Sequence, residues 1–416
     1  MKSATIKGRA AAWSVPLANE LAALARSVIL ARLLGPEELG KVMLLALALR
    51  LVEMASDVSI ERLLAQSHDG DDPGLQHNLQ GITALRGLAL AIILLALAVP
   101  LAMAFSDGPA VASYALLALV PLIRGFVHLD YRRRERHFDY RGLAIVDGGA
   151  AIVMICVTPV FAALIGDHRA LLGIIVVQVA AQFLLSHLVA ERRYRLLLER
   201  DCAVRVWTFG APLILNAGLL FLTFQADRLI VAGYYGWAEL GLYGVALQLA
   251  LLPAQIAGRA AGSLLAPKFR RAIAAGNLAQ AARPALQSYL ALSAVFLLGF
   301  GILAAPVIRL VYGQAFVIDQ TLIWALGLAA AIRIARTPVS QLALALGKTS
   351  IPLRGNILRA LAIIPALMAA MAGAPLYALA LAAVVGEAMA GLRAWFLLKN
   401  CLSAQCGTST KSEVFA

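Results

Sequence analysis

Charged residues are scarce in this chain. Asp, Glu, Lys and Arg make up 14% of its 416 residues, whereas an average soluble domain contains about 25%. Hydrophobic residues account for 61%. So few polar side chains cannot cover the two or three domains that a soluble chain of this length would form. The composition argues against a soluble enzyme, excludes a disordered chain and indicates a polytopic membrane protein.

Motifs for metal binding, nucleotide hydrolysis and nucleophilic catalysis are also missing. The four cysteines form no CxxC pair and no zinc spacing, so they predict no disulfide framework. Lys348 follows a glycine, but Leu342 occupies the first glycine position of the Walker A pattern, and no HExxH sequence occurs. His68 and the nearby aspartates are typical of a solvated turn. We expect no metal, no cofactor and no enzymatic activity.

Long apolar runs are abundant, and a bilayer-spanning helix needs about 20 mostly apolar residues. Twelve such segments can be placed along the chain, six in each half. They run over 13–33, 40–60, 82–105, 110–129, 143–165, 170–190, 207–232, 239–262, 284–306, 320–345, 353–372 and 375–398. The sequence therefore predicts an all-α membrane protein of twelve helices, followed by a polar cytoplasmic tail over 401–416.

Positive charge outnumbers negative charge, with 36 Lys and Arg against 23 Asp and Glu and a net charge of +13. With a cytoplasmic N-terminus, 22 basic residues lie in inner segments and four in outer loops, as the positive-inside rule requires. The count predicts that both termini are cytoplasmic. Orientation and attraction to anionic head groups account for these loops, so we expect membrane lipids and no nucleic acid as partners.

An internal repeat links the two halves of the chain. Five of ten positions match between ARLLGPEELG at 31–40 and AGYYGWAELG at 232–241. Both copies lie at the turn between the first and second predicted span of their half, and an even number of spans separates them. The halves therefore share one orientation. We predict two six-helix bundles related by a parallel repeat, over 1–200 and 201–400.

Two stretches carry a family resemblance: RLLGPEELG at 32–40, and DRLIV at 227–231 with the second copy of the repeat and Pro253 beyond it. They resemble the polysaccharide (Wzx-type) flippases of the multidrug/oligosaccharidyl-lipid/polysaccharide exporter superfamily. The resemblance implies alternating-access export of undecaprenyl-pyrophosphate-linked oligosaccharide repeat units across the bacterial inner (plasma) membrane. It also implies polysaccharide assembly proteins as partners. Twelve helices argue against the fourteen-helix lipid II flippases.

Apart from Arg32 and Arg354, which lie at span ends and are counted with the loops, ten arginines fall within the predicted spans. A charged side chain there is costly and faces a water-filled interior or a partner. Five lie near cytoplasmic span ends, from which they can reach the head groups: Arg86, Arg124, Arg259, Arg359 and Arg393. The deeper five are the predicted substrate-binding residues: Arg26, Arg50, Arg228, Arg333 and Arg336. Arginine binds phosphate through a planar bidentate fork, which suits an anionic cargo. Ion pairing of Arg50 with Glu53 is the structural alternative.

Acidic and polar residues in the spans complete the predicted machinery. The candidates for carrying a coupled proton or sodium ion are Glu53, Asp57 and Glu387. The candidates for bonding sugar hydroxyls are Asn216, Gln225 and Gln341.

Two other functions stay open. A cation-coupled multidrug exporter of the same superfamily should have an acidic or aromatic cavity, which the deep arginines disfavour. A membrane-embedded polymerase or glycosyltransferase needs large periplasmic loops, and the longest predicted outer loop has about a dozen residues.

Overall fold

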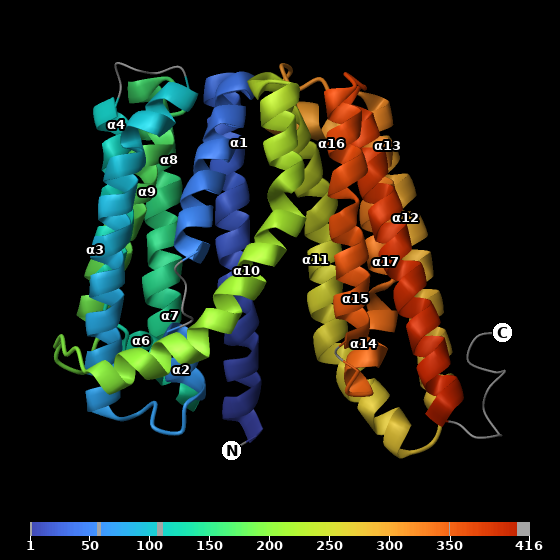
Figure 1. The fold of residues 1–416 in the computed structure, drawn as a ribbon, viewed down its shortest axis with the longest axis horizontal. Coiled ribbons are helices and arrows are strands. Elements are labelled where there is room, and N and C mark those ends of the chain that lie inside the picture. The colour runs from blue at the N-terminus through green and yellow to red at the C-terminus, as the bar shows by residue number, and fades with distance from the viewer. Residues whose placement is uncertain (1, 56–59, 106–110, 349, 406–416) are drawn as a thin grey trace. The chain divides into compact units, whose positions relative to one another are not determined.

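The computed structural model describes residues 2–55, 60–105, 111–348 and 350–405, which form helices joined by turns and irregular loops, without any strand (Figure 1). Contacts divide the chain into two compact units, Met1–Phe221 and Leu222–Ala416. The boundary falls inside helix α10 (Arg200–Tyr234). The division into six-helix bundles at residue 200 stays a prediction.

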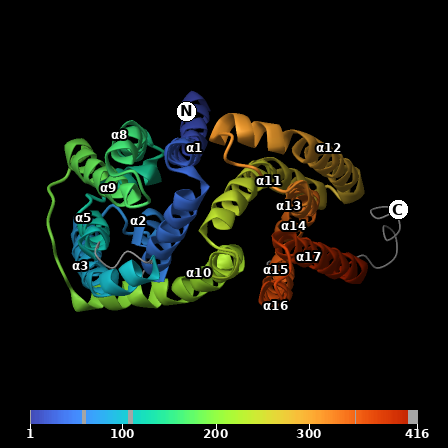
Figure 2. The same cartoon turned by 90° about the horizontal axis from the view of Figure 1, so that it is seen from above.

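The first unit is built from helices that run up and down, with several interrupted by short 3-10 or π turns (Figures 1 and 2). Its elements before α10 are α1 (Lys2–Ala55), α2 (Ile60–Gln66), α3 (Pro73–Ala104), α4 (Val111–Ala115), η2 (Leu116–Ala118), α5 (Leu119–Gly125), α6 (Asp130–Arg134), η3 (Glu135–His137), α7 (Arg141–Leu143), η4 (Ala144–Gly148), α8 (Gly149–Ile165) and α9 (Ala170–Val189).

The second unit continues from α10 with longer helices, two of which are broken near their middle. Its elements are α11 (Trp237–Ala274), α12 (Leu278–Tyr312), α13 (Gln320–Ala335), α14 (Thr337–Ala345), α15 (Ser350–Leu361), α16 (Ile363–Met371) and α17 (Leu376–Gln405).

The repeated sequence produces the same backbone turn in both units. Gly35, inside α1, has φ 82° and ψ 178° and joins two helices that correspond to the first two predicted spans. Gly236, just before α11, has φ 92° and ψ 175°. This backbone region is accessible essentially only to glycine, because a side chain would clash there. The match between the two copies therefore has a conformational cause.

Most predicted spans meet a direct test of length and composition. Eight helical segments of the described residues are long and apolar enough to cross a membrane, and the pair Val111–Gly125 and Asp130–His137, bent by 51°, makes a ninth. These nine correspond to the third to sixth and eighth to twelfth predicted spans. The first and seventh predicted spans lie on α1 and α10, and α1 also covers the second predicted span as far as Ala55. The prediction of an all-α, multi-pass membrane protein is confirmed, while cytoplasmic termini stay a prediction.

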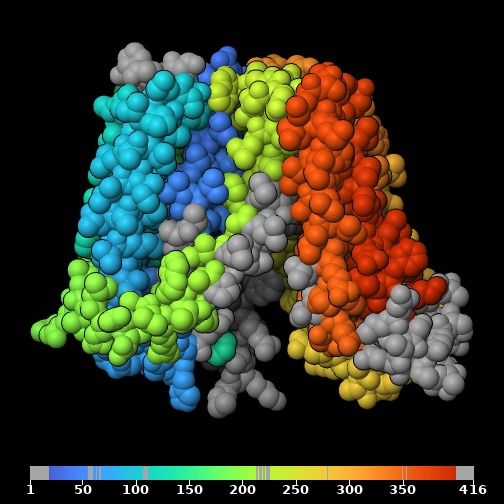
Figure 3. Space-filling view, viewed as in Figure 1, coloured from blue at the N-terminus to red at the C-terminus, as the bar shows by residue number. Residues whose placement is uncertain are grey.

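Large apolar side chains cover outward faces of the helices, as a hydrocarbon environment requires. On α12, Leu290, Val295, Ile302 and Leu310 are between 63% and 73% exposed. α3 carries a similar set, and Figure 3 shows its side chains at the surface of the first unit. In water such surfaces would drive aggregation, whereas lipid chains accommodate them.

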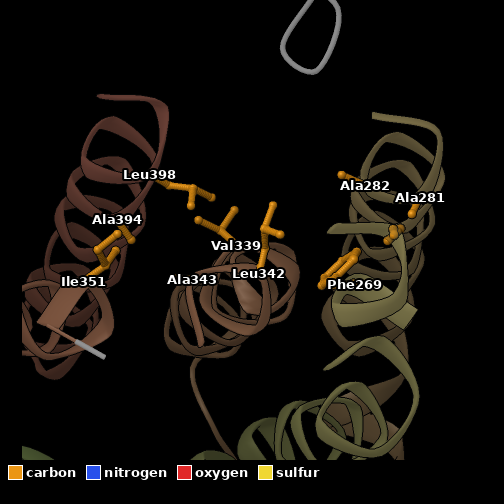
Figure 4. Close-up of a cluster of buried hydrophobic side chains, with 11 residues drawn as sticks. Phe269, Ala281, Ala282, Val339, Leu342, Ala343, Ile351, Ala394 and Leu398 are labelled. Atoms are coloured by element: carbon orange, nitrogen blue, oxygen red, sulfur yellow. The ribbon is translucent and has the colours of Figure 1, made fainter. Parts of the chain in front are cut away.

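Buried apolar residues hold one end of the second unit together. Phe269 of α11 and Ala282 of α12 pack on one side of α14, and Ala394 and Leu398 of α17 lie on the other (Figure 4). Val339 of α14 lies between them and is 5% exposed. The short helix α14 is therefore held on both sides.

Candidate functional site

Two helix breaks in the second unit place arginines at helix ends. Pro338 has no N–H to donate to the carbonyl of Ile334, so the helix is interrupted between α13 and α14, with Arg336 at the break. Pro365 follows the break between α15 and α16 in the same way. Arg333 and Arg359 lie in the last turns of α13 and α15. The partial negative charge at a helix C-terminus stabilises cations there.

Glu387, on α17, joins the two breaks. Its carboxylate accepts a hydrogen bond from Arg336 Nε at 2.8 Å and another from Arg359 Nη1 at 3.1 Å. The three side chains are only 8–12% exposed. Gly386 permits this approach, because a Cβ at that position would lie 2.6 Å from the Cβ of Ala362. One carboxylate thus holds arginines from two other helices.

A cationic cavity of about 460 Å³ lies beside this ion-pair cluster. Its charged lining residues are Arg259, Arg333, Arg336 and Arg359. Its uncharged polar lining residues are Gln255, Thr337, Ser340, Gln341 and Asn356. None of the described residues that line it is acidic. The volume lies within the range of about 300–1,000 Å³ that is usual for ligand sites. Guanidinium groups beside amides and hydroxyls can bind phosphate and sugar hydroxyls together.

A smaller cavity of about 110 Å³ shares Arg333 and Arg359 with the cationic cavity but has mainly apolar walls. Asp227 and Glu387 are its two carboxylates. The hydroxyl of Tyr243, which is buried at 1% exposure, donates to Asp227 Oδ2 at 2.8 Å. Across the ion-pair cluster and this cavity, three arginines (Arg333, Arg336 and Arg359) face two carboxylates. The formal charge of these five side chains is therefore +1.

The predicted substrate and ion residues do not all meet in one site. Arg333, Arg336 and Glu387 are brought together in the second unit, and Gln341 lines the cavity beside them. Arg228 lies in the same unit, where its guanidinium donates to the side chain of Gln225. Neither residue of that pair is among the described residues that line the two cavities.

The predicted residues of the first unit occupy separate positions. Arg26 is half-buried, with Nη1 3.3 Å from the sulfur of Met154. Arg50 is exposed, and Glu53 pairs with Arg124 instead. Among the described residues, no ion pair joins Arg50 to Glu53, so the structural alternative is not found. Asp57 lies outside the described residues.

Two arginines of the site, Arg359 and Arg259, lie elsewhere than the sequence predicts. Arg359 was expected to reach the head groups, but it is 8% exposed and paired with Glu387, so that expectation is wrong. Arg259, expected in the same group, lines the cationic cavity. Because both arginines lie near predicted span ends, the sequence does not distinguish them from arginines that reach the head groups. The one local signal is a proline shortly after each arginine: Pro365 lies six residues after Arg359, and Pro338 lies two residues after Arg336.

A family model described as "polysaccharide biosynthesis protein" matches residues 29–318. The chain belongs to this family. The family resemblance inferred from the repeat and its flanking residues is thereby confirmed. The succinoglycan biosynthesis transport protein ExoT of Rhizobium meliloti (strain 1021) is 26% identical to this family member over 301 residues, which are 69% of this chain and 58% of ExoT.

Solved structures of transport proteins share the fold of this family member. The lipid II flippase MurJ in an inward closed conformation matches with a TM-score of 0.73 and 13% identity, covering 98% of this chain and 94% of that chain. An inward-facing multidrug resistance transporter of the MATE family matches with a TM-score of 0.69 and 16% identity, covering 94% and 96%. The likeness shows that this chain has the fold of these membrane proteins.

Proposed function

We propose that this protein flips undecaprenyl-pyrophosphate-linked oligosaccharide repeat units across the bacterial inner membrane by alternating access, without chemically changing them. The observation that carries this proposal is the cationic cavity, in which four arginines and five uncharged polar residues line one space among membrane helices. The family and the transport role named for ExoT support the same assignment. Polysaccharide assembly proteins are the partners we expect.

In this mechanism the arginines stabilise the pyrophosphate away from bulk water. Arg333 and Arg359 lie at helix C-termini, which offset part of the cost of holding their charge in the membrane. Phosphate oxygens accept charge-assisted hydrogen bonds from guanidinium groups, while Gln341 and Asn356 bond sugar hydroxyls. The hydrocarbon chain of the substrate stays in an apolar environment throughout.

Glu387 has a defined part in the cycle. In the absence of substrate its carboxylate pairs with both Arg336 and Arg359 and offsets one of their two charges, which limits the buried positive charge. Substrate phosphate competes with Glu387 for the same two guanidinium groups. A proton or sodium ion on Glu387 would weaken its hold on them and favour substrate binding. Glu387 is therefore our first candidate for ion coupling, ahead of Glu53, which pairs with Arg124 in the first unit.

Export of cationic drugs is the alternative function. The small cavity with Asp227 and Tyr243 is the feature that favours it, because a carboxylate in an apolar cavity suits an organic cation. The arginines that border the same cavity repel such a substrate. Unchanged drug susceptibility on deletion of the gene, measured beside the polysaccharide assay, would exclude this alternative.

The decisive test combines gene deletion with complementation by Arg333→Gln/Arg336→Gln. We expect the deletion strain to lose surface polysaccharide and to accumulate the lipid-linked repeat in the inner leaflet, as measured by lectin binding to inverted vesicles. The double variant should insert at the wild-type level but not restore export. Arg309→Gln, which changes an exposed arginine of α12, should restore it fully. Normal outer-leaflet exposure of the repeat in the deletion strain would refute the proposed function.

A further inference from the structure

A second opening reaches Arg336 from another side of the second unit. It is a groove of about 790 Å³ between α12, the α13–α14 break and α17. Its walls are mostly apolar, and two of its leucines, Leu290 and Leu392, are 63% and 60% exposed. The groove is therefore open to its surroundings along an apolar surface, as a site for a hydrocarbon chain in a membrane must be.

Arg336 connects this groove to the cationic cavity, because it lines both. The other strongly polar side chains of the groove are Arg283 and Gln287 of α12, and none of the described residues that line it is acidic. One guanidinium thus lies between a polar space and an apolar one. An amphiphile with an anionic head and a hydrocarbon chain has the complementary distribution of charge and apolar surface.

Small residues widen the groove where it passes the arginine. Ala335 comes from α13, and Ala388 and Gly391 come from α17. A Cβ at Gly391 would meet the Cβ of Arg336 at 3.7 Å, which is ordinary van der Waals contact. The missing side chains leave space beside Arg336 that a methyl-branched chain can occupy.

We propose that this groove binds the isoprenoid chain of the lipid carrier while the attached phosphate contacts Arg336. The inference rests on the proposed function, and it adds a site for the part of the substrate that stays in lipid. The orientation predicted from loop charge places the start of α12 and the end of α17 toward the cytoplasm. The groove would then accept the chain from the inner leaflet.

The test uses purified full-length protein in nanodiscs and an undecaprenyl phosphate that carries a diazirine in its isoprenoid chain. We expect photolabelling on α12 and α17. Excess unlabelled undecaprenyl phosphate should reduce it about tenfold, whereas the same excess of phosphatidylglycerol should leave it within about twofold. Gly391→Leu fills the groove without changing any charge and should reduce labelling by a similar factor. Gly299→Leu is the matched control, because a Cβ there meets nothing within 4 Å.

Several outcomes would overturn the inference. Equal competition by phosphatidylglycerol would make the groove a general contact for anionic lipid, and labelling unaffected by Gly391→Leu would place the chain elsewhere. Ala388→Leu fills the same groove from a second position, so a folding defect of one variant leaves the test intact. If the wild-type protein is labelled specifically but does not restore export to the deletion strain, the proposed function is refuted, whereas the isoprenoid site still stands.

Discussion

Neutralising Glu387 should destabilise the second unit more than removing either of its arginine partners. Glu387→Gln preserves the side-chain shape but removes the carboxylate that bonds both Arg336 and Arg359 at 8–12% exposure. Removal of one partner of a buried ion pair costs about 3–5 kcal/mol. For a unit of this size that corresponds to a fall in melting temperature of roughly 10 °C. Arg336→Gln or Arg359→Gln leaves the carboxylate one arginine, so each should cost less, about 1.5–3 kcal/mol.

A double-mutant cycle separates the ion pair from other effects of substitution. Thermal unfolding in detergent is measured for Glu387→Gln, Arg359→Gln and the double variant, with Glu239→Gln as an exposed-carboxylate control. We expect the double variant to be more stable than the sum of the single losses predicts, by about 1.5–3 kcal/mol. A coupling energy near zero, with Glu387→Gln as stable as the control, would refute the pairing and return Arg359 to the head-group region.

Three further predictions concern packing, turns and acid stability. Gly386→Val places a branched side chain against Ala362, so it should separate α15 from α17 and lower the free energy of unfolding by about 1–3 kcal/mol. Both the melting temperature and export should fall. A variant with wild-type stability and export would contradict the close approach of the two helices. Gly35→Ala and Gly236→Ala should each lower the free energy of unfolding by about 1–3 kcal/mol, because the positive-φ conformation of these glycines is unfavourable for alanine. Thermal unfolding measures this loss. A loss of stability at only one of the two positions would contradict the equivalence of the two turns. In the loop before α3, the hydrogen bond from Arg205 lowers the pKa of Asp69 to about 2. Because the folded pKa lies below the unfolded value of about 3.9, this pair stabilises the protein above about pH 4 and loses its effect as the pH falls toward 2. The pair is 45% exposed, so Asp69→Asn should cost less than about 1 kcal/mol at neutral pH and remove this part of an acid titration of the melting temperature.

The basic loops are predicted from local charge alone. Their position on one side of the predicted membrane is a sum over loop charges and needs no contact information. In the structure, however, several of these arginines are ion-paired with acids of the same end of the first unit. Arg133 donates to Asp130 at 2.8 Å, and Arg134 donates to Asp139 at 2.9 Å. Attraction to lipid head groups is therefore an incomplete account of these residues, because part of their charge is satisfied within the protein.

The sequence predicts part of the candidate site. Arg333, Arg336 and Glu387 stand out in the sequence because a charged residue in an apolar run is costly. Their association is not visible there, since Arg336 and Glu387 are 51 residues apart and Arg359 and Glu387 are 28 apart. Arg359 looked ordinary because its position in the run suggested access to the head groups. Contact between α15 and α17, permitted by Gly386, gives it a buried partner instead.

The sequence by itself determined the environment, the helical class, the family and the repeated glycine turn of this protein. Each follows from a local property: the length of an apolar run, the charge of a loop, or a glycine that alone tolerates one backbone conformation. Only the tertiary structure decided which arginines share a cavity, and that an apolar groove meets that cavity at Arg336. The physical reason is that a buried charge selects its partner across helices, so its environment depends on how α13, α15 and α17 pack.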